Sequence, residues 1–120
     1  MSKKTLVIGA SENPSRYSFL AINKLKANGH EVVAIGLKNS EVAGVRIRTE
    51  NELFTDIDTV TLYINPKIQE KYLAYVIGLK PKRIIFNPGT ENESFETLAK
   101  DNGIEALEAC TLVMLSTGQF

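Results

Sequence analysis

The chain has 120 residues, of which 43% are hydrophobic and 23% are charged, as is typical of one globular domain with a single core. Lys and Arg balance Asp and Glu at 14 each, so charge does not favour nucleic acid as a partner. No apolar run is long enough to span a bilayer, and residues 1–10 are too short and too polar for a signal peptide. The single cysteine, Cys110, excludes an internal disulfide and a Cys-rich metal site. We therefore expect one cytoplasmic domain over residues 1–120, with no membrane partner and no metal.

Short apolar runs alternate with helical patterns along the whole chain. The runs predict strands at residues 5–9, 31–36, 58–64, 83–86 and 104–107. Strands that alternate with helices imply right-handed crossovers and a parallel sheet with helices on both faces. The predicted fold is α/β, a Rossmann-like three-layer sandwich with a five-stranded, mostly parallel sheet.

Apolar stripes and capping residues predict the helices. The first helix covers residues 15–28. The second begins at Asn65, with Pro66 at its first position. A third follows Thr90, which forms a capping box with Glu93.

Three other segments are less regular. Thr49 and Glu52 match another capping box and predict a brief helix, and residues 44–47 predict a short extended piece. The tail, residues 110–120, fits a helix or a strand. It either packs on the domain's own core or offers its apolar residues 112–115 as a surface for a homo-oligomer.

The turn after the first predicted strand is the candidate ligand site. Ligands of open parallel sheets bind beyond the carboxyl ends of the strands, and a strand, tight turn and helix in that order present backbone N–H groups to a phosphate. The turn and helix add three hydroxyls and one cation, those of Ser11, Ser15, Ser18 and Arg16. Lys38 ends the second strand at the same edge. In the alternative interpretation, Ser11 and Ser15 cap the helix and Arg16 is a solvated surface charge.

A standard NAD site is disfavoured. The dinucleotide fingerprint needs three glycines, and this turn has only Gly9, with Ser11 and Pro14 at the second and third positions. Nor does an acidic residue end the second strand to bind a ribose hydroxyl, because Gly36-Leu37-Lys38 stands there. Lys38 would suit the 2′-phosphate of NADP as well as a phosphate of coenzyme A, so it does not discriminate between them.

The run Val7-Ile8-Gly9-Ala10-Ser11, followed by Asn13-Pro14-Ser15, Tyr17-Ser18 and Gly29-His30-Glu31-Val32-Val33, resembles the CoA-binding domain family. These are small stand-alone Rossmann-like proteins similar to the CoA-binding part of the succinyl-CoA synthetase alpha subunit. The resemblance covers nearly the whole chain and implies coenzyme A or an acyl-CoA as the ligand.

By position, the resemblance also implies roles for individual residues. Contacts to the CoA phosphates would come from Gly9, Ala10, Ser11, Pro14, Ser15 and Ser18, with Lys38 near the ADP phosphates. Ile64, Asn65 and Pro66 would line the adenine side, and Asn87, Pro88 and Gly89 the pantetheine side. Gly36-Leu37 departs from the Asn-Pro that many relatives carry after the second strand.

No set of residues predicts a catalytic site. His30, the only histidine, falls at the opposite end of the sheet from the binding loops, which excludes a Ser–His pair there. Tyr63, Tyr72 and Tyr75 are assigned to the core. We therefore expect a non-catalytic module that binds coenzyme A. Two alternatives stay open: a small NAD(P)-linked or acyl-transfer enzyme whose site is completed by oligomerisation, and an interaction domain with a vestigial site.

Overall fold

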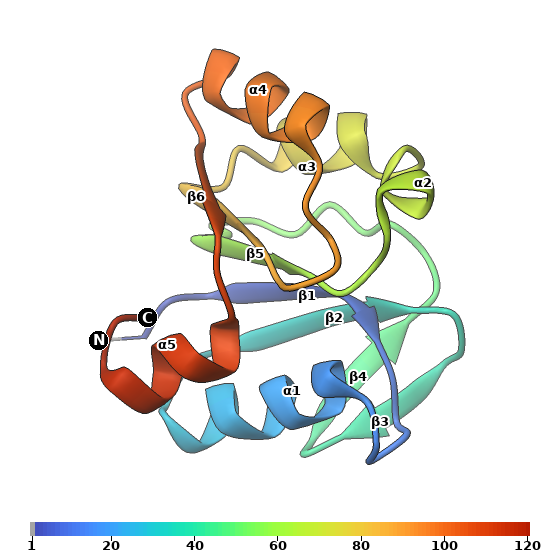
Figure 1. The fold of residues 1–120 in the computed structure, drawn as a ribbon. Coiled ribbons are helices and arrows are strands. Elements are labelled where there is room, and N and C mark those ends of the chain that lie inside the picture. The colour runs from blue at the N-terminus through green and yellow to red at the C-terminus, as the bar shows by residue number, and fades with distance from the viewer. Residues whose placement is uncertain (1) are drawn as a thin grey trace.

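A single sheet of seven strands runs through the computed structural model, which describes residues 2–120 (Figure 1). The strands are β1 (Thr5–Ala10), β2 (Val32–Gly36), β3 (Ser40–Val42), β4 (Val45–Arg48), β5 (Thr59–Leu62), β6 (Arg83–Phe86) and β7 (Glu105–Glu108). The helices are α1 (Tyr17–Ala27), α2 (Pro66–Gln69), α3 (Leu73–Leu79), α4 (Glu93–Asp101) and α5 (Thr111–Thr117). Every helix within residues 2–120 is too short or too polar to cross a bilayer.

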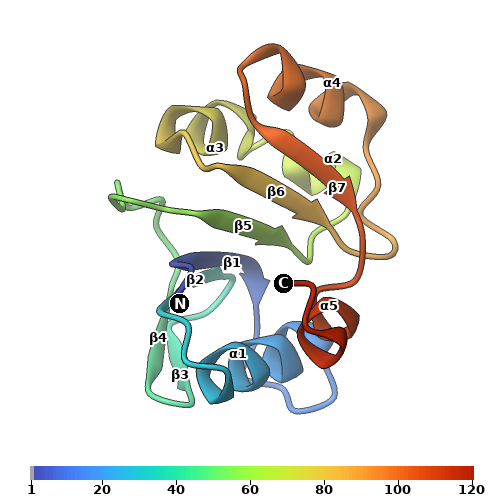
Figure 2. The same cartoon turned by 90° about the vertical axis from the view of Figure 1, so that its left-hand side faces the viewer.

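The strand order is β3-β4-β2-β1-β5-β6-β7, and only the pairing of β3 with β4 is antiparallel. The chain builds one half of the sheet outward from β1 and then crosses back to add β5 on the other side of β1. Figure 2 shows the arrowheads of β5, β6 and β7 turned toward the same edge. The switch in strand order therefore places the carboxyl ends of β1, β2 and β5 next to one another.

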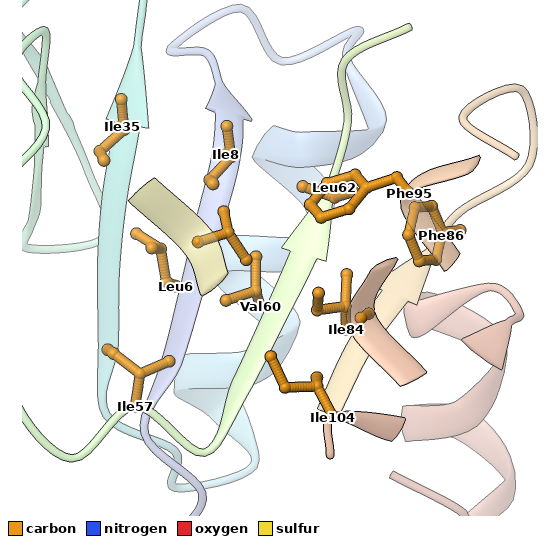
Figure 3. Packing of buried hydrophobic residues seen from close by; sticks show 12 residues of the cluster. Leu6, Ile8, Ile35, Ile57, Val60, Leu62, Ile84, Phe86, Phe95 and Ile104 are labelled. Carbon is orange, nitrogen blue, oxygen red and sulfur yellow. The ribbon is translucent and has the colours of Figure 1, made fainter. Parts of the chain in front are cut away.

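Each face of the sheet has its own apolar core. The face covered by α3 and α4 buries Leu6, Ile8, Ile35, Ile57, Val60, Leu62, Val76, Ile84, Phe86, Phe95, Ala99 and Ile104 (Figure 3). The opposite face, under α1 and α5, buries Val7, Ala10, Ile22, Leu25, Val32, Ala34, Val42, Val45, Ile47 and Leu115. Because residues of a strand alternate between faces, burial on both sides explains the nearly continuous apolar runs of β1 and β2.

The Rossmann-like α/β fold with a mostly parallel sheet is as predicted, but the prediction of five strands was wrong. The two additional strands form a hairpin at the edge, β3 and β4, and the extended piece expected at 44–47 is β4. Ala43 and Gly44 connect them with φ values of +51° and +79°, as a two-residue hairpin turn requires. The hairpin was missed because its strands have only three and four residues and Ala43 stands where Asn or Asp usually signals the turn.

Neither of the two predicted capping boxes forms. Glu52 does not cap a helix, because its carboxylate pairs with Nη1 of Arg48 at 2.7 Å and the segment is irregular. Helix α4 is capped by Asn92, whose Oδ1 accepts the Phe95 N–H at 3.2 Å, and not by Thr90. The Thr90 hydroxyl instead donates to the Asn87 carbonyl at 2.7 Å. In both cases another nearby partner, three or four residues earlier in the chain, takes the side chain that the pattern assigned to the helix.

The helix expected after β5 begins as predicted but is interrupted. Asn65 caps α2 by accepting the Ile68 N–H at 2.9 Å, with Pro66 as the first helical residue. The chain then makes a tighter turn, in which the Tyr72 N–H donates to the Gln69 carbonyl at 2.8 Å, before α3 begins. The interruption accompanies Gln69, whose side chain is completely buried.

The tail is helical and packs against the domain itself. Helix α5 lies beside α1 (Figure 1), and Leu115 is buried in the same cluster as Ile22 and Leu25. Val113, by contrast, is 57% exposed. Leu115 packs in the domain's own core. The use of this segment as a surface for a homo-oligomer stays a prediction.

Candidate functional site

A cleft of about 650 Å³ opens at the carboxyl edge of the sheet, where the strand order switches. Its walls come from the turn after β1, the start of α1, the loop after β2 and the loops after β5 and β6. The lining residues are Gly9, Ala10, Ser11, Glu12, Asn13, Arg16, Tyr17, Ser18, Gly36, Leu37, Lys38, Ser40, Tyr63, Ile64, Asn65, Ile68, Tyr72, Pro88, Gly89 and Thr90.

Most of the predicted site residues line this cleft. They are Gly9, Ala10, Ser11, Arg16, Ser18, Lys38, Ile64, Asn65, Pro88 and Gly89. The predicted residues that do not line the cleft are Pro14, Ser15, Pro66 and Asn87. The fold thus brings together four loops that are far apart in sequence, and the roles assigned to their residues stay predictions.

Two glycines allow the backbone to close the floor of the cleft. A Cβ on Gly9 would lie 2.7 Å from the Tyr63 carbonyl oxygen, and Gly9 has a φ of +92°. A Cβ on Gly36 would lie 2.3 Å from the Ala10 carbonyl oxygen. Side chains cannot be placed at either point without moving backbone, because real Cβ contacts are never so short. Glycine at both positions therefore lets the ends of β1, β2 and β5 approach closely.

The turn after β1 is folded by its own polar groups. The Ser11 hydroxyl accepts the Asn13 N–H at 3.1 Å. Asn13 Oδ1 accepts both the N–H and the hydroxyl of Ser15, at 3.0 and 2.8 Å. Neither serine caps α1, whose N-cap residue is Arg16 and which has no side-chain cap. The alternative interpretation of Ser11 and Ser15 as helix caps is therefore wrong.

The first turn of α1 is left without acceptors. Within residues 2–120, the N–H groups of Tyr17, Ser18 and Phe19 donate to no acceptor, and the first turn carries no acidic residue. The Arg16 and Ser18 side chains lie at the cleft beside these amides. Unpaired amides, the positive end of the helix dipole and a guanidinium together make this end of the cleft suitable for an anion.

Lys38 faces this turn from the loop after β2. Its ammonium group pairs with the Glu12 carboxylate at 3.0 Å, with side chains 78% and 48% exposed. Lys38, which is predicted to bind a phosphate, thus has a counter-ion within the protein.

Gln69 holds together the wall of the cleft that the loops after β5 and β6 form. Its Nε2 donates to the carbonyls of Ile64 and Thr90, both at 2.8 Å, and its Oε1 accepts the Asn92 amide at 2.9 Å. Ile64 and Thr90 line the cleft. One completely buried side chain therefore joins the loop after β5 to the loop after β6.

Replacing Gln69 with leucine should lower the free energy of unfolding by about 3 kcal/mol, because it leaves buried polar groups of three residues unpaired. Urea denaturation monitored by circular dichroism measures the change. The control is Glu70→Leu, which introduces the same side chain at the exposed neighbouring position. Equal stability of the two variants would contradict the role given to Gln69.

Asn87 supports the loop after β6 from below. Its Nδ2 donates to the Thr61 hydroxyl at 2.7 Å and the Leu62 carbonyl at 2.8 Å, and its Oδ1 accepts the Thr111 N–H at 2.9 Å. This residue is 2% exposed and does not line the cleft. Its side chain holds β5, β6 and α5 together, and its role on the pantetheine side stays a prediction.

Sequence reasoning missed the apolar wall of the cleft. Tyr63, Ile68 and Tyr72 all line it, although their spacing fits a buried core face. The useful signal is that Tyr63 directly follows β5 and that Ile68 and Tyr72 lie in and just beyond α2, on the side of the sheet where ligands of open parallel sheets bind. Burial raises the pKa of Tyr63 to about 12, so its phenol stays protonated at neutral pH.

The other reactive side chains lie away from the cleft. His30 Nδ1 accepts the Lys3 N–H at 3.0 Å, and burial is the main cause that lowers the pKa of this histidine. Neither His30 nor Cys110 lines the cleft. Within residues 2–120, His, Cys, Asp and Glu do not gather in a group of three or more that could hold a metal ion.

Solved structures with the same fold are similar to this chain. A crystal structure of an uncharacterized protein shares 51% sequence identity and covers 100% of this chain and 99% of its own, with a TM-score of 0.97. A conserved hypothetical protein from Pyrococcus furiosus is 26% identical over 92% of this chain and 97% of its own, with a TM-score of 0.81. A hypothetical protein from Pyrococcus horikoshii OT3 is 24% identical over 97% and 83%, with a TM-score of 0.87.

Among curated proteins, no significant sequence match is found. The family model described as "CoA binding domain" matches residues 3–116, which includes all four loops of the cleft. The chain therefore belongs to the CoA binding domain family.

Proposed function

We propose that the chain binds coenzyme A or an acyl-CoA in the cleft at the carboxyl edge of the sheet, as a binding module without catalysis. The observation that carries the proposal is the unpaired first turn of α1, which opens into the cleft beside Arg16 and Ser18. The family to which the chain belongs supports the same ligand.

The lining of the cleft combines the two kinds of group that coenzyme A needs. Ser11, Arg16 and the amides of α1 offer donors to the phosphates. Ile68 and Tyr72 offer apolar surface, and Ile64 adds more beside the turn after β1, where its Cγ2 would lie 2.9 Å from a Cβ on Gly9. A cleft lined by a few polar groups together with aliphatic and aromatic side chains suits an anionic ligand with an uncharged arm.

NADP is the second candidate, and Lys38 is the residue that favours it, because an ammonium group suits a ribose phosphate. Against it, Ser11 and Pro14 replace two glycines of the dinucleotide fingerprint. Ser11 lines the cleft, and in the fingerprint a glycine at its position lets the pyrophosphate of a dinucleotide approach the backbone.

Thermal unfolding with CoA, acetyl-CoA, NAD, NADP and ATP tests the proposal. A ligand at 100 times its dissociation constant stabilises the folded state by about 2.7 kcal/mol. We expect a rise in the unfolding temperature with CoA or acetyl-CoA and little change with the other three. A shift with NADP alone would replace the proposal with the second candidate, and no shift with any CoA compound would refute it.

A further inference from the structure

The ion pair between Lys38 and Glu12 connects two walls of the cleft. Glu12 belongs to the turn after β1, and Lys38 to the loop after β2; both residues line the cleft. Their charged atoms are 3.0 Å apart. Glu12 therefore places a carboxylate in the same cleft as Arg16 and the first turn of α1, which offer a cation and donors to an anion.

In the Lys38–Glu12 ion pair, a ligand phosphate can replace the Glu12 carboxylate. With side chains 78% and 48% exposed, its two charges are largely hydrated, and an exposed pair contributes little to stability. The phosphate groups of coenzyme A together carry more negative charge than one carboxylate, so a ligand bound at the adjacent amides of α1 competes well for the same ammonium group. Glu12, left beside that phosphate, would repel it.

We propose that Glu12 limits ligand affinity by holding Lys38, and that Lys38 exchanges Glu12 for a ligand phosphate on binding. The proposal rests on the proposed function, since it concerns the same cleft. In the bound state Lys38 then contacts a ligand phosphate. Glu12, which belongs to no motif described above, helps to select ligands that carry a phosphate at this place. A ligand that places no phosphate near Lys38 leaves the pair intact and gains nothing from it.

Isothermal titration calorimetry with CoA on the full chain tests the exchange in a double-mutant cycle. Glu12→Gln should tighten binding about three- to tenfold, because Lys38 is freed and a repulsion is removed. Lys38→Gln should weaken binding about tenfold. In the Lys38→Gln background, Glu12→Gln should give a smaller gain, because only the repulsion remains to be removed.

Glu105→Gln is the matched control, since it makes the same charge change at an exposed residue at the start of β7, away from the cleft. It should leave the affinity unchanged. Unchanged or weaker binding by Glu12→Gln would overturn the inference, as would an equal gain with and without Lys38. Failure of the unaltered protein to bind CoA would instead refute the proposed function itself, and the inference with it. A crystal of the CoA complex with Lys38 still on Glu12 would also overturn the exchange.

Discussion

Replacing Gly9 with alanine should lower the free energy of unfolding by about 3 kcal/mol. The new Cβ would lie 2.7 Å from the Tyr63 carbonyl oxygen and 2.9 Å from Ile64 Cγ2, at a φ of +92°. To relieve these close contacts, β1 would have to move away from the loop after β5, and the floor of the cleft would become wider. Chemical denaturation measures the loss of stability.

Gly29→Ala separates the steric clash of the new Cβ from the cost of a positive φ, the two causes of that loss. Gly29 also has a positive φ, +81°, but a Cβ there meets nothing within 4 Å. It should therefore lose only the conformational part, about 1 kcal/mol. If both variants lose the same amount, the close approach of β1 to the loop after β5 does not constrain the fold.

Replacing Ser11 with aspartate should weaken CoA binding about 100-fold or more, because a carboxylate would face the ligand's phosphate. The fold should stay intact, since an Asp side chain can accept the Asn13 N–H as the Ser11 hydroxyl does at 3.1 Å. The measurement is the CoA-induced shift in unfolding temperature, supported by calorimetry.

Ser11→Asn is the control for that variant, because asparagine has nearly the same shape as aspartate and the same ability to form the turn, but carries no charge. It should keep the affinity within about tenfold of the unaltered protein. If the aspartate and asparagine variants bind CoA equally well, the turn after β1 does not contact a phosphate.

Much of the sheet could be predicted because its signals are local. Continuous apolar runs mark β1 and β2, and Asn65-Pro66 marks the start of α2 by a cap and a fixed φ. Since parallel strands end at one edge, these elements also place the four loops of the cleft together. The order of the loops along the chain was enough to predict where the cleft lies.

The errors at the two capping boxes concern side chains that take another nearby partner. Glu52 pairs with Arg48, four residues earlier, and the Thr90 hydroxyl binds the Asn87 carbonyl, three residues earlier, so neither caps a helix. A short-range rule does not say which of several nearby partners a side chain takes. Asn87, by contrast, bonds to Thr61 and Thr111, which are far away in sequence and which no local pattern contains.

The Gln69 bonds give the two walls of the cleft unequal stiffness. In the wall formed by the loops after β5 and β6, a buried amide fastens Ile64 to Thr90. In the turn after β1, the bonds among Ser11, Asn13 and Ser15 are all exposed and join close neighbours, and Glu12 adds only an exposed ion pair with Lys38. A ligand bound as proposed would thus meet one preformed surface and one adaptable one, and any induced fit would be confined to the turn after β1.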